Sequence, residues 1–151
     1  MSDDSSGKAG AGSSSPKKPF SRHFPAIARY LLGLPLLVFG LNAFLNFIPQ
    51  PTTPLPADAA AFLGALMKSG YMMKLIGATH LAVAISLLSN RFVPLGLALF
   101  APFIVNAIAF HASIERSGLP MAAVFLALEV YLAWKYRHSF GPMLAARASP
   151  S

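Results

Sequence analysis

The sequence contains no cysteine and few charged residues. Without cysteine, the chain on its own offers no disulfide, no thiol redox chemistry and no thiolate ligand for a metal. Charged residues make up 11% of the chain, whereas a soluble domain has about 25%. The motifs of zinc hydrolases, phosphate-binding loops and serine nucleophile elbows are also missing. These absences argue against a soluble enzyme, and they name no reaction.

The sequence instead contains several long apolar runs. Residues 92–110 carry no formal charge, and at ~1.5 Å per residue this run can cross a hydrocarbon core of ~30 Å. Similar runs occupy residues 24–48, 71–89 and 119–136. We therefore predict an all-α fold, an integral membrane four-helix bundle over residues 24–140. A disordered basic tail is expected at 1–23 and a flexible tail at 141–151, both cytoplasmic.

The connection between the first two predicted spans is long. Residues 49–56 are too rich in proline for helix or sheet. Asp58 then offers an N-cap for a helix from Ala59 to Lys68, which Ser69 and Gly70 end. An apolar stripe on this helix predicts a short external interfacial helix over the bundle mouth. It is either a flap over a ligand site or a purely structural lid.

Positive charge divides unevenly between the two sides of such a bundle. With the amino terminus inside, nine basic residues fall on the cytoplasmic side and three outside, which fits the positive-inside rule. The charge of +7 is therefore assigned to topology, with no nucleic-acid partner. The inner set is Lys8, Lys17, Lys18, Arg22, Arg29, Arg91, Lys135, Arg137 and Arg147, and the outer set is Lys68, Lys74 and Arg116.

Small residues indicate where helices are expected to touch. Gly33 and Gly40 lie seven residues apart in the first predicted span, on one face that a neighbouring helix can approach closely. His80 has Gly77 three residues before it and Ala84 four residues after it. We therefore expect the His80 side chain to point into the bundle.

Polar residues inside the spans form two predicted layers. Counting from the outer ends places His80 and Glu129 ~14 Å deep, and Asn42 and Asn106 ~8 Å deep. An ionised Glu129 alone in lipid is costly, so we hypothesise a hydrogen bond or ion pair between His80 and Glu129. Asn42 is the predicted partner of Asn106.

These residues have two interpretations. They are either interhelical hydrogen bonds that fix helix register, or a ligand-binding or proton-relay site. A bis-histidine haem is excluded because His80 and His111 lie at different levels. No metal site, no catalytic residue and no bound cofactor are predicted, and a quinone is a possible ligand. The candidate site residues are Asn42, Asn46, His80, Asn106, His111 and Glu129.

Several short stretches follow one another along the chain in a recognisable order. They are Gly-Leu-Asn-Ala-Phe-Leu-Asn-Phe at 40–47, Gly70-Tyr71 with Lys74, Arg91-Phe-Val-Pro-Leu95, Ala101-Pro-Phe-Ile-Val-Asn106 with Phe110-His111, and Glu129 with Ala133-Trp-Lys-Tyr-Arg137. In this order they resemble the DoxX-like family of small bacterial four-helix membrane proteins. The resemblance covers residues 29–140 and implies a multi-pass protein of the bacterial plasma membrane. Family members commonly carry an acidic residue where this chain has His80.

The resemblance implies association with an oxidoreductase system, because relatives include oxidoreductase subunits. The function expected first is a membrane subunit or binding module, not catalytic alone. Its polar pocket would take a quinone-like or other small amphipathic molecule. The first alternative is a small proton-coupled transporter that uses His80 and Glu129 as a relay. The second is a structural membrane anchor for a partner enzyme.

Overall fold

The computed structural model describes residues 23–49 and 54–141, so most of the two predicted tails and residues 50–53 lie outside the described residues. The described part is helical and contains no strand, which confirms the all-α prediction. The elements in chain order are α1 (Phe24–Leu45), α2 (Ala57–Lys68), α3 (Met72–Leu88), α4 (Val93–Ser113), the 3-10 helix η2 (Arg116–Gly118), α5 (Leu119–Lys135) and α6 (Arg137–Phe140).

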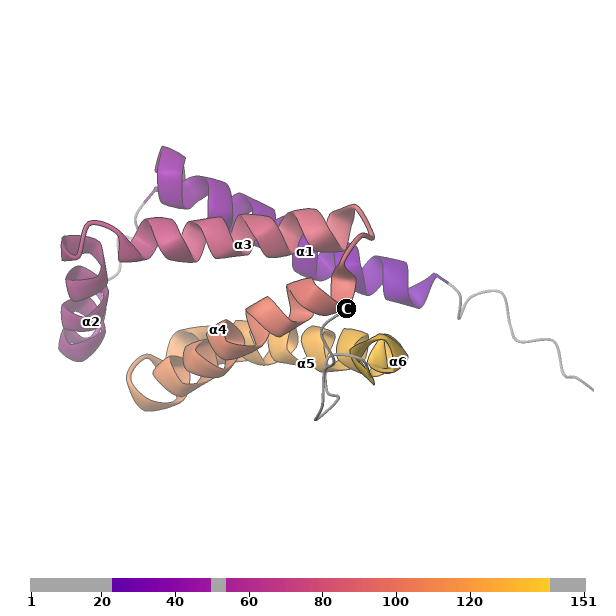
Figure 1. The fold of residues 1–151 in the computed structure, drawn as a ribbon. Coiled ribbons are helices and arrows are strands. Elements are labelled where there is room, and N and C mark those ends of the chain that lie inside the picture. The colour runs from indigo at the N-terminus through magenta and orange to yellow at the C-terminus, as the bar shows by residue number, and fades with distance from the viewer. Residues whose placement is uncertain (1–22, 50–53, 142–151) are drawn as a thin grey trace, which may run out of the picture.

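The four long helices form two pairs (Figure 1). Helices α1 and α3 lie side by side in one layer, and α4 and α5 lie side by side in the other. The layers converge at the end that carries the turn from Ser89 to Phe92, which we call the turn end. They diverge at the opposite end, where α2 stands across the space between α3 and α4, and we call this the α2 end. The α2 end is therefore the less closed half of the bundle.

Helices α1 and α3 touch through glycines. A methyl group added at Gly40 would lie 3.0 Å from the carbonyl oxygen of Gly77, and one added at Gly77 would overlap the side chain of Ala43. A methyl group at Gly33 would lie 3.0 Å from Leu88. Any larger residue at these positions would push the two helices apart. The prediction that Gly33 and Gly40 mark a close helix contact is confirmed.

The hydrophobic core lies near the turn end. Its fully buried side chains come from residues 32–36 of α1, 83–87 of α3, 93–104 of α4 and from Leu132 of α5. Dense packing therefore holds these parts of the four helices together. These side chains are Leu32, Leu36, Val83, Leu87, Val93, Leu97, Phe100, Ile104 and Leu132.

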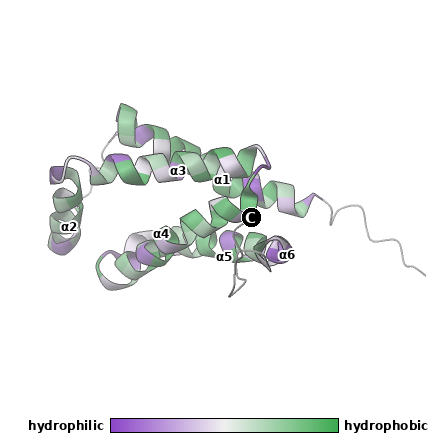
Figure 2. Cartoon of the chain, viewed as in Figure 1, coloured by the Kyte–Doolittle hydropathy of each residue, from purple (hydrophilic) through white to green (hydrophobic). Residues whose placement is uncertain are grey.

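Apolar residues predominate along the helices (Figure 2), and many of their large side chains are exposed. Large side chains such as Val105 and Trp134 are 63% and 66% exposed. Within the described residues, three helices are long and apolar enough to cross a membrane, namely α1, α4 and η2 with α5. Helices α2 and α3 qualify only as a pair, and they meet at 87°. The described chain thus has three candidate spans, or four if the bent pair counts as one.

Two predicted helix ends need correction. Helix α1 ends at Leu45 and not at Ile48, because Asn46 adopts a left-handed conformation with φ of 49° and donates its N–H to the carbonyl of Asn42. Helix α2 begins at Ala57, so Asp58 lies in its first turn and is not the N-cap, which is Pro56. A carboxylate in the first turn still interacts favourably with the helix dipole.

Candidate functional site

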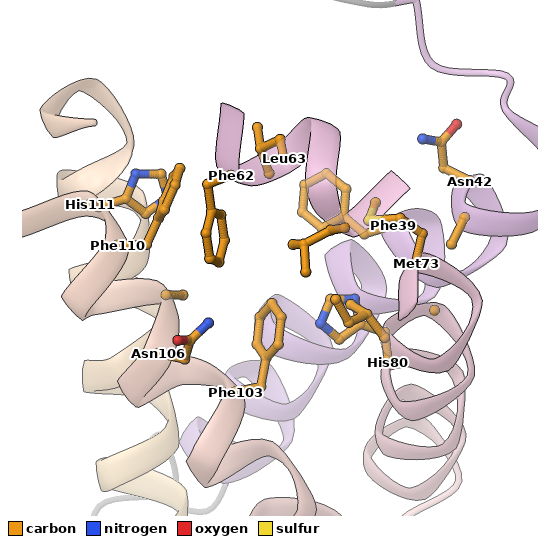
Figure 3. Close-up of a pocket in the computed structure, with 15 residues that line it drawn as sticks. Phe39, Asn42, Phe62, Leu63, Met73, His80, Phe103, Asn106, Phe110 and His111 are labelled. Carbon is orange, nitrogen blue, oxygen red and sulfur yellow. The ribbon is translucent and has the colours of Figure 1, made fainter. Parts of the chain in front are cut away.

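A pocket of about 400 Å³ opens at the α2 end (Figure 3). Helices α1, α3 and α4 form its walls, and the apolar face of α2 covers it. Four phenylalanine rings line it, namely Phe39, Phe62, Phe103 and Phe110. Asn42, His80, Asn106 and His111 supply its polar side chains. An apolar enclosure with a few polar groups is the usual form of a small-molecule site.

His80 is the buried polar residue of this pocket. Its side chain is 7% exposed, and the face it shares with Gly77 and Ala84 is buried, as predicted. The imidazole meets the Phe103 ring edge-on, with 4.3 Å between ring centroids. Its Nε2 atom is buried without a hydrogen-bond partner in the described part of the chain. A buried nitrogen without a partner is costly, so this atom is a natural point for a ligand to bond.

The predicted pair between His80 and Glu129 is wrong as a direct contact. Among residues 23–49 and 54–141 no hydrogen bond or ion pair joins them, and Glu129 does not line the pocket. Glu129 is buried on α5, 5% exposed, and its Oε2 atom also has no partner there. Counting residues gives the depth of a side chain but not the direction in which its helix turns it. Phe100 and Phe103 contact the imidazole of His80.

The two asparagines are brought to one pocket but not to each other. Asn42 uses its Oδ1 atom to accept the N–H of Ile48 at 2.7 Å, which secures the chain beyond the end of α1. Figure 3 shows Asn106 across the pocket from Asn42, and no hydrogen bond joins them in the described structure. Asn42 therefore has a structural task, whereas Asn106 offers a free amide to the pocket.

A second cavity of about 310 Å³ adjoins the first. It shares Asn42, Leu63 and Met73 with the main pocket and adds Asn46 and Lys74. Asn46 therefore lies in the same region as the other asparagines. Its left-handed backbone conformation at the end of α1 is enough to explain an asparagine at this position. All predicted site residues except Glu129 line one or the other of these two cavities.

His111 at the end of α4 belongs to a hydrogen-bonded cluster that the sequence analysis did not predict. Its Nδ1 atom lies 2.9 Å from the backbone oxygen of Glu115 and 3.0 Å from the Oε2 atom of the same residue. Glu115 caps η2: its Oε2 accepts the N–H of Gly118 at 3.1 Å, and its Oε1 accepts the N–H of Ser117 at 2.8 Å and the Ser117 hydroxyl.

These bonds fix the charge of Glu115, which lies between the candidate spans. Hydrogen bonds from the Ser117 hydroxyl and backbone, with smaller contributions from Gly118 and His111, lower its pKa from 4.5 to about 2. Glu115 is therefore ionised at physiological pH. The sequence signal for this cap is an acidic residue two positions before Ser117 and three before Gly118.

Arg29 on α1 has a feature that its charge alone does not predict. Its Nε and Nη1 atoms are buried and have no hydrogen-bond partner in the described ranges. No group of three or more potential metal ligands occurs in those ranges. The buried polar atoms without a partner in those ranges thus occur at three separate residues, namely His80 in the pocket, Glu129 on α5 and Arg29 on α1.

Comparison with known proteins adds no relative. No family model, no curated protein and no solved structure matches the chain. The resemblance to the DoxX-like family therefore stays a prediction. The fold and site define an all-helical protein with three or four candidate spans and a covered pocket at one end.

Proposed function

We propose that this chain is a multi-pass membrane protein that binds a small amphipathic ring compound, of which a quinone is one example, in the pocket beneath α2. The exposed apolar side chains of α1, α4 and α5 support the membrane location, because a soluble protein rarely exposes so many. The basic residues favour a topology with both termini in the cytoplasm and the α2 end outside.

One observation carries the binding proposal. The pocket combines four phenylalanine rings with a buried imidazole nitrogen that has no partner in the described structure. Aromatic walls favour a flat ring in the ligand, and the free Nε2 of His80 favours a polar group on that ring. Its volume of about 400 Å³ matches a small ring compound and is too small for a folded partner segment.

The resemblance to the DoxX-like family favours a role as a membrane subunit of an oxidoreductase system. The alternative is a proton-coupled transporter that relays protons between His80 and Glu129. No hydrogen bond joins these two residues in the described chain, so the structure offers no direct path for such a relay. A purely structural anchor does not require an open pocket with an unpartnered imidazole. We therefore place the binding subunit first.

A matched pair of substitutions tests the pocket. Ala107 on α4 lines it, whereas Ala109, two residues further on the same helix, is exposed and does not. Ala107→Phe should fill the space and lower the affinity for the probe 1,4-naphthoquinone by about tenfold or more. Ala109→Phe should leave the affinity within about twofold. Equilibrium binding to the purified full chain in detergent measures both.

The same experiment can overturn the proposal. Equal affinities of the two variants and the original chain would place the probe elsewhere, in the detergent or on the outer surface. No saturable binding to the original chain would remove the ring-compound proposal. Extraction and mass spectrometry of small molecules that purify with the chain then identify the natural ligand class, and Ala107→Phe should lose that ligand.

A further inference from the structure

We propose that Glu115 is a positioning residue that fixes one tautomer of His111, so that the outer end of the pocket accepts a hydrogen bond from a ligand hydroxyl. This inference rests on the proposed function, since it names the ligand chemistry of the same pocket. The ligand class is a ring compound with a hydroxyl donor, such as a phenol or a hydroquinone. A ring that carries only carbonyl or ether oxygens fits this end less well.

The tautomer follows from the two atoms that face Nδ1 of His111. One is the backbone oxygen of Glu115 at 2.9 Å, and the other is its carboxylate oxygen at 3.0 Å. Both can only accept a hydrogen bond, so Nδ1 must carry the proton. In the neutral imidazole, the Nε2 atom is then left with a lone pair and no proton.

Further donors hold the carboxylate of Glu115 in place beside the imidazole. Glu115 is 9% exposed, and Ser117 and Gly118 donate to it in addition to His111. Gly118 also makes room for the ring, because a methyl group there would lie 2.5 Å from Nδ1 and 2.7 Å from Nε2. The Phe110 ring meets the imidazole edge-on at 5.2 Å. The ring is thus held between Gly118 and Phe110 with its Nδ1 engaged.

The other ring nitrogen of His111, Nε2, is the one left for a ligand. His111 lines it from α4, and Nε2 forms no hydrogen bond within the described residues. Figure 3 shows His111 beside Phe62 and Phe110, on the opposite side of the pocket from His80. A ring between the aromatic walls would have an imidazole near each side. The fixed acceptor at His111 selects a hydroxyl at that side.

A pair of probes with the same ring tests the inference. 1-Naphthol carries a hydroxyl donor where 1-methoxynaphthalene has none. At about pH 8, the chain should bind 1-naphthol about 3- to 10-fold more tightly than 1-methoxynaphthalene. Glu115→Gln should lower this ratio, because an amide NH2 can replace one of the two acceptors that face Nδ1, whereas the backbone oxygen of residue 115 stays in place. The matched acid-to-amide control, Asp58→Asn on exposed α2, should keep the ratio.

Nitrogen NMR of the imidazole gives a readout that does not depend on a ligand. In the original chain, His111 should show a protonated Nδ1 and a bare Nε2. Glu115→Gln, which keeps the backbone acceptor but replaces the carboxylate, should show a larger share of the other tautomer. A protonated Nε2 in the original chain would overturn the inference even if Glu115→Gln does not fold. Equal binding of the two probes to the original chain would also overturn it while leaving the pocket proposal intact. Failure of naphthol, methoxynaphthalene and naphthoquinone alike would instead count against the proposed function.

Discussion

Gly118 leaves the space that the ring of His111, a lining residue of the pocket, occupies. Its φ of −82° suits any residue, so the requirement for glycine is one of room and not of backbone conformation. Gly118→Ala should displace the His111 ring, break its bonds to Glu115 and lower the melting temperature by several degrees. Gly64→Ala is the control, because an added methyl group on α2 meets nothing within 4 Å and should leave the melting temperature unchanged or raise it. Thermal unfolding in detergent compares the two, and an unchanged melting temperature for Gly118→Ala would contradict the assigned role.

Glu129 illustrates a buried polar group that does not stabilise the fold. Its Oε2 atom has no partner in the described residues, and such a group costs about 1–3 kcal/mol. Glu129→Leu keeps the volume and removes this cost, so it should raise the melting temperature, whereas Glu129→Ala leaves a cavity and should lower it. Thermal unfolding of the purified chain distinguishes the two changes. A loss of stability in Glu129→Leu would indicate a partner for the carboxylate.

Glu115 should make stability depend on pH in a defined window. Its pKa is about 2 in the folded chain and 4.5 in its ordinary state, so the unfolded chain binds the proton more readily. The stabilisation is complete above the ordinary pKa and is lost as pH falls from about 4.5 towards about 2. Glu115→Gln should remove this part of the acid sensitivity, which melting temperatures between about pH 6 and about pH 3 would reveal. Asp58→Asn should keep it, and identical pH profiles for Glu115→Gln and the original chain would contradict the assignment.

At the scale of elements, α2 acts as the cover of the pocket. Phe62 on α2 packs against Phe110 on α4, with 5.3 Å between ring centroids, and this contact bridges the two layers. Phe62→Ala should weaken the contact between α2 and α4 and speed the dissociation of naphthoquinone several-fold. The melting temperature should change little, because Phe62 lies outside the buried core. Lys68→Ala is the control, because Lys68 lies on the same helix, is exposed and lines neither of the two cavities. Stopped-flow displacement measures both rates, and equal rates would show that α2 does not limit ligand exit.

The sequence predicts the elements better than their contacts. Length and hydropathy are enough to place α1, α3, α4 and α5 within a few residues. A helix that crosses a membrane needs an apolar run of about 20 residues, and such runs can be read directly from the sequence. Small residues also predict that α1 meets α3 at Gly40. The partners of polar side chains are not predictable in this way. Counting gives His80 and Glu129 the same depth, but the rotation of α3 and α5 about their axes is decided by tertiary packing.

At the scale of the whole molecule, one end is closed and the other is open. The core lies at the turn end, where Leu36, Leu87 and Phe100 are fully buried, and the pocket lies at the α2 end. Residue counting predicts that Asn42, Asn106 and His111 share the outer half of the bundle, and they do share one pocket. The opening between the layers depends on how α4 and α5 pack as a pair, which no local pattern in the sequence encodes.

The absence of cysteine makes the topology directly testable. Single cysteines at Gly64 and Ser113 mark the α2 end, and one at Ser139 marks the turn end, all at exposed positions. With four spans and both termini inside, a membrane-impermeant maleimide applied to intact cells should label the first two and spare the third, and disruption of the membrane should make all three reactive. Ser139 reacting in intact cells would reverse the orientation. Labelling of Gly64 and Ser113 from opposite sides of the membrane would contradict the arrangement in which α3 crosses the membrane and α2 covers the pocket. The pocket beneath α2 would then face another compartment than the one proposed.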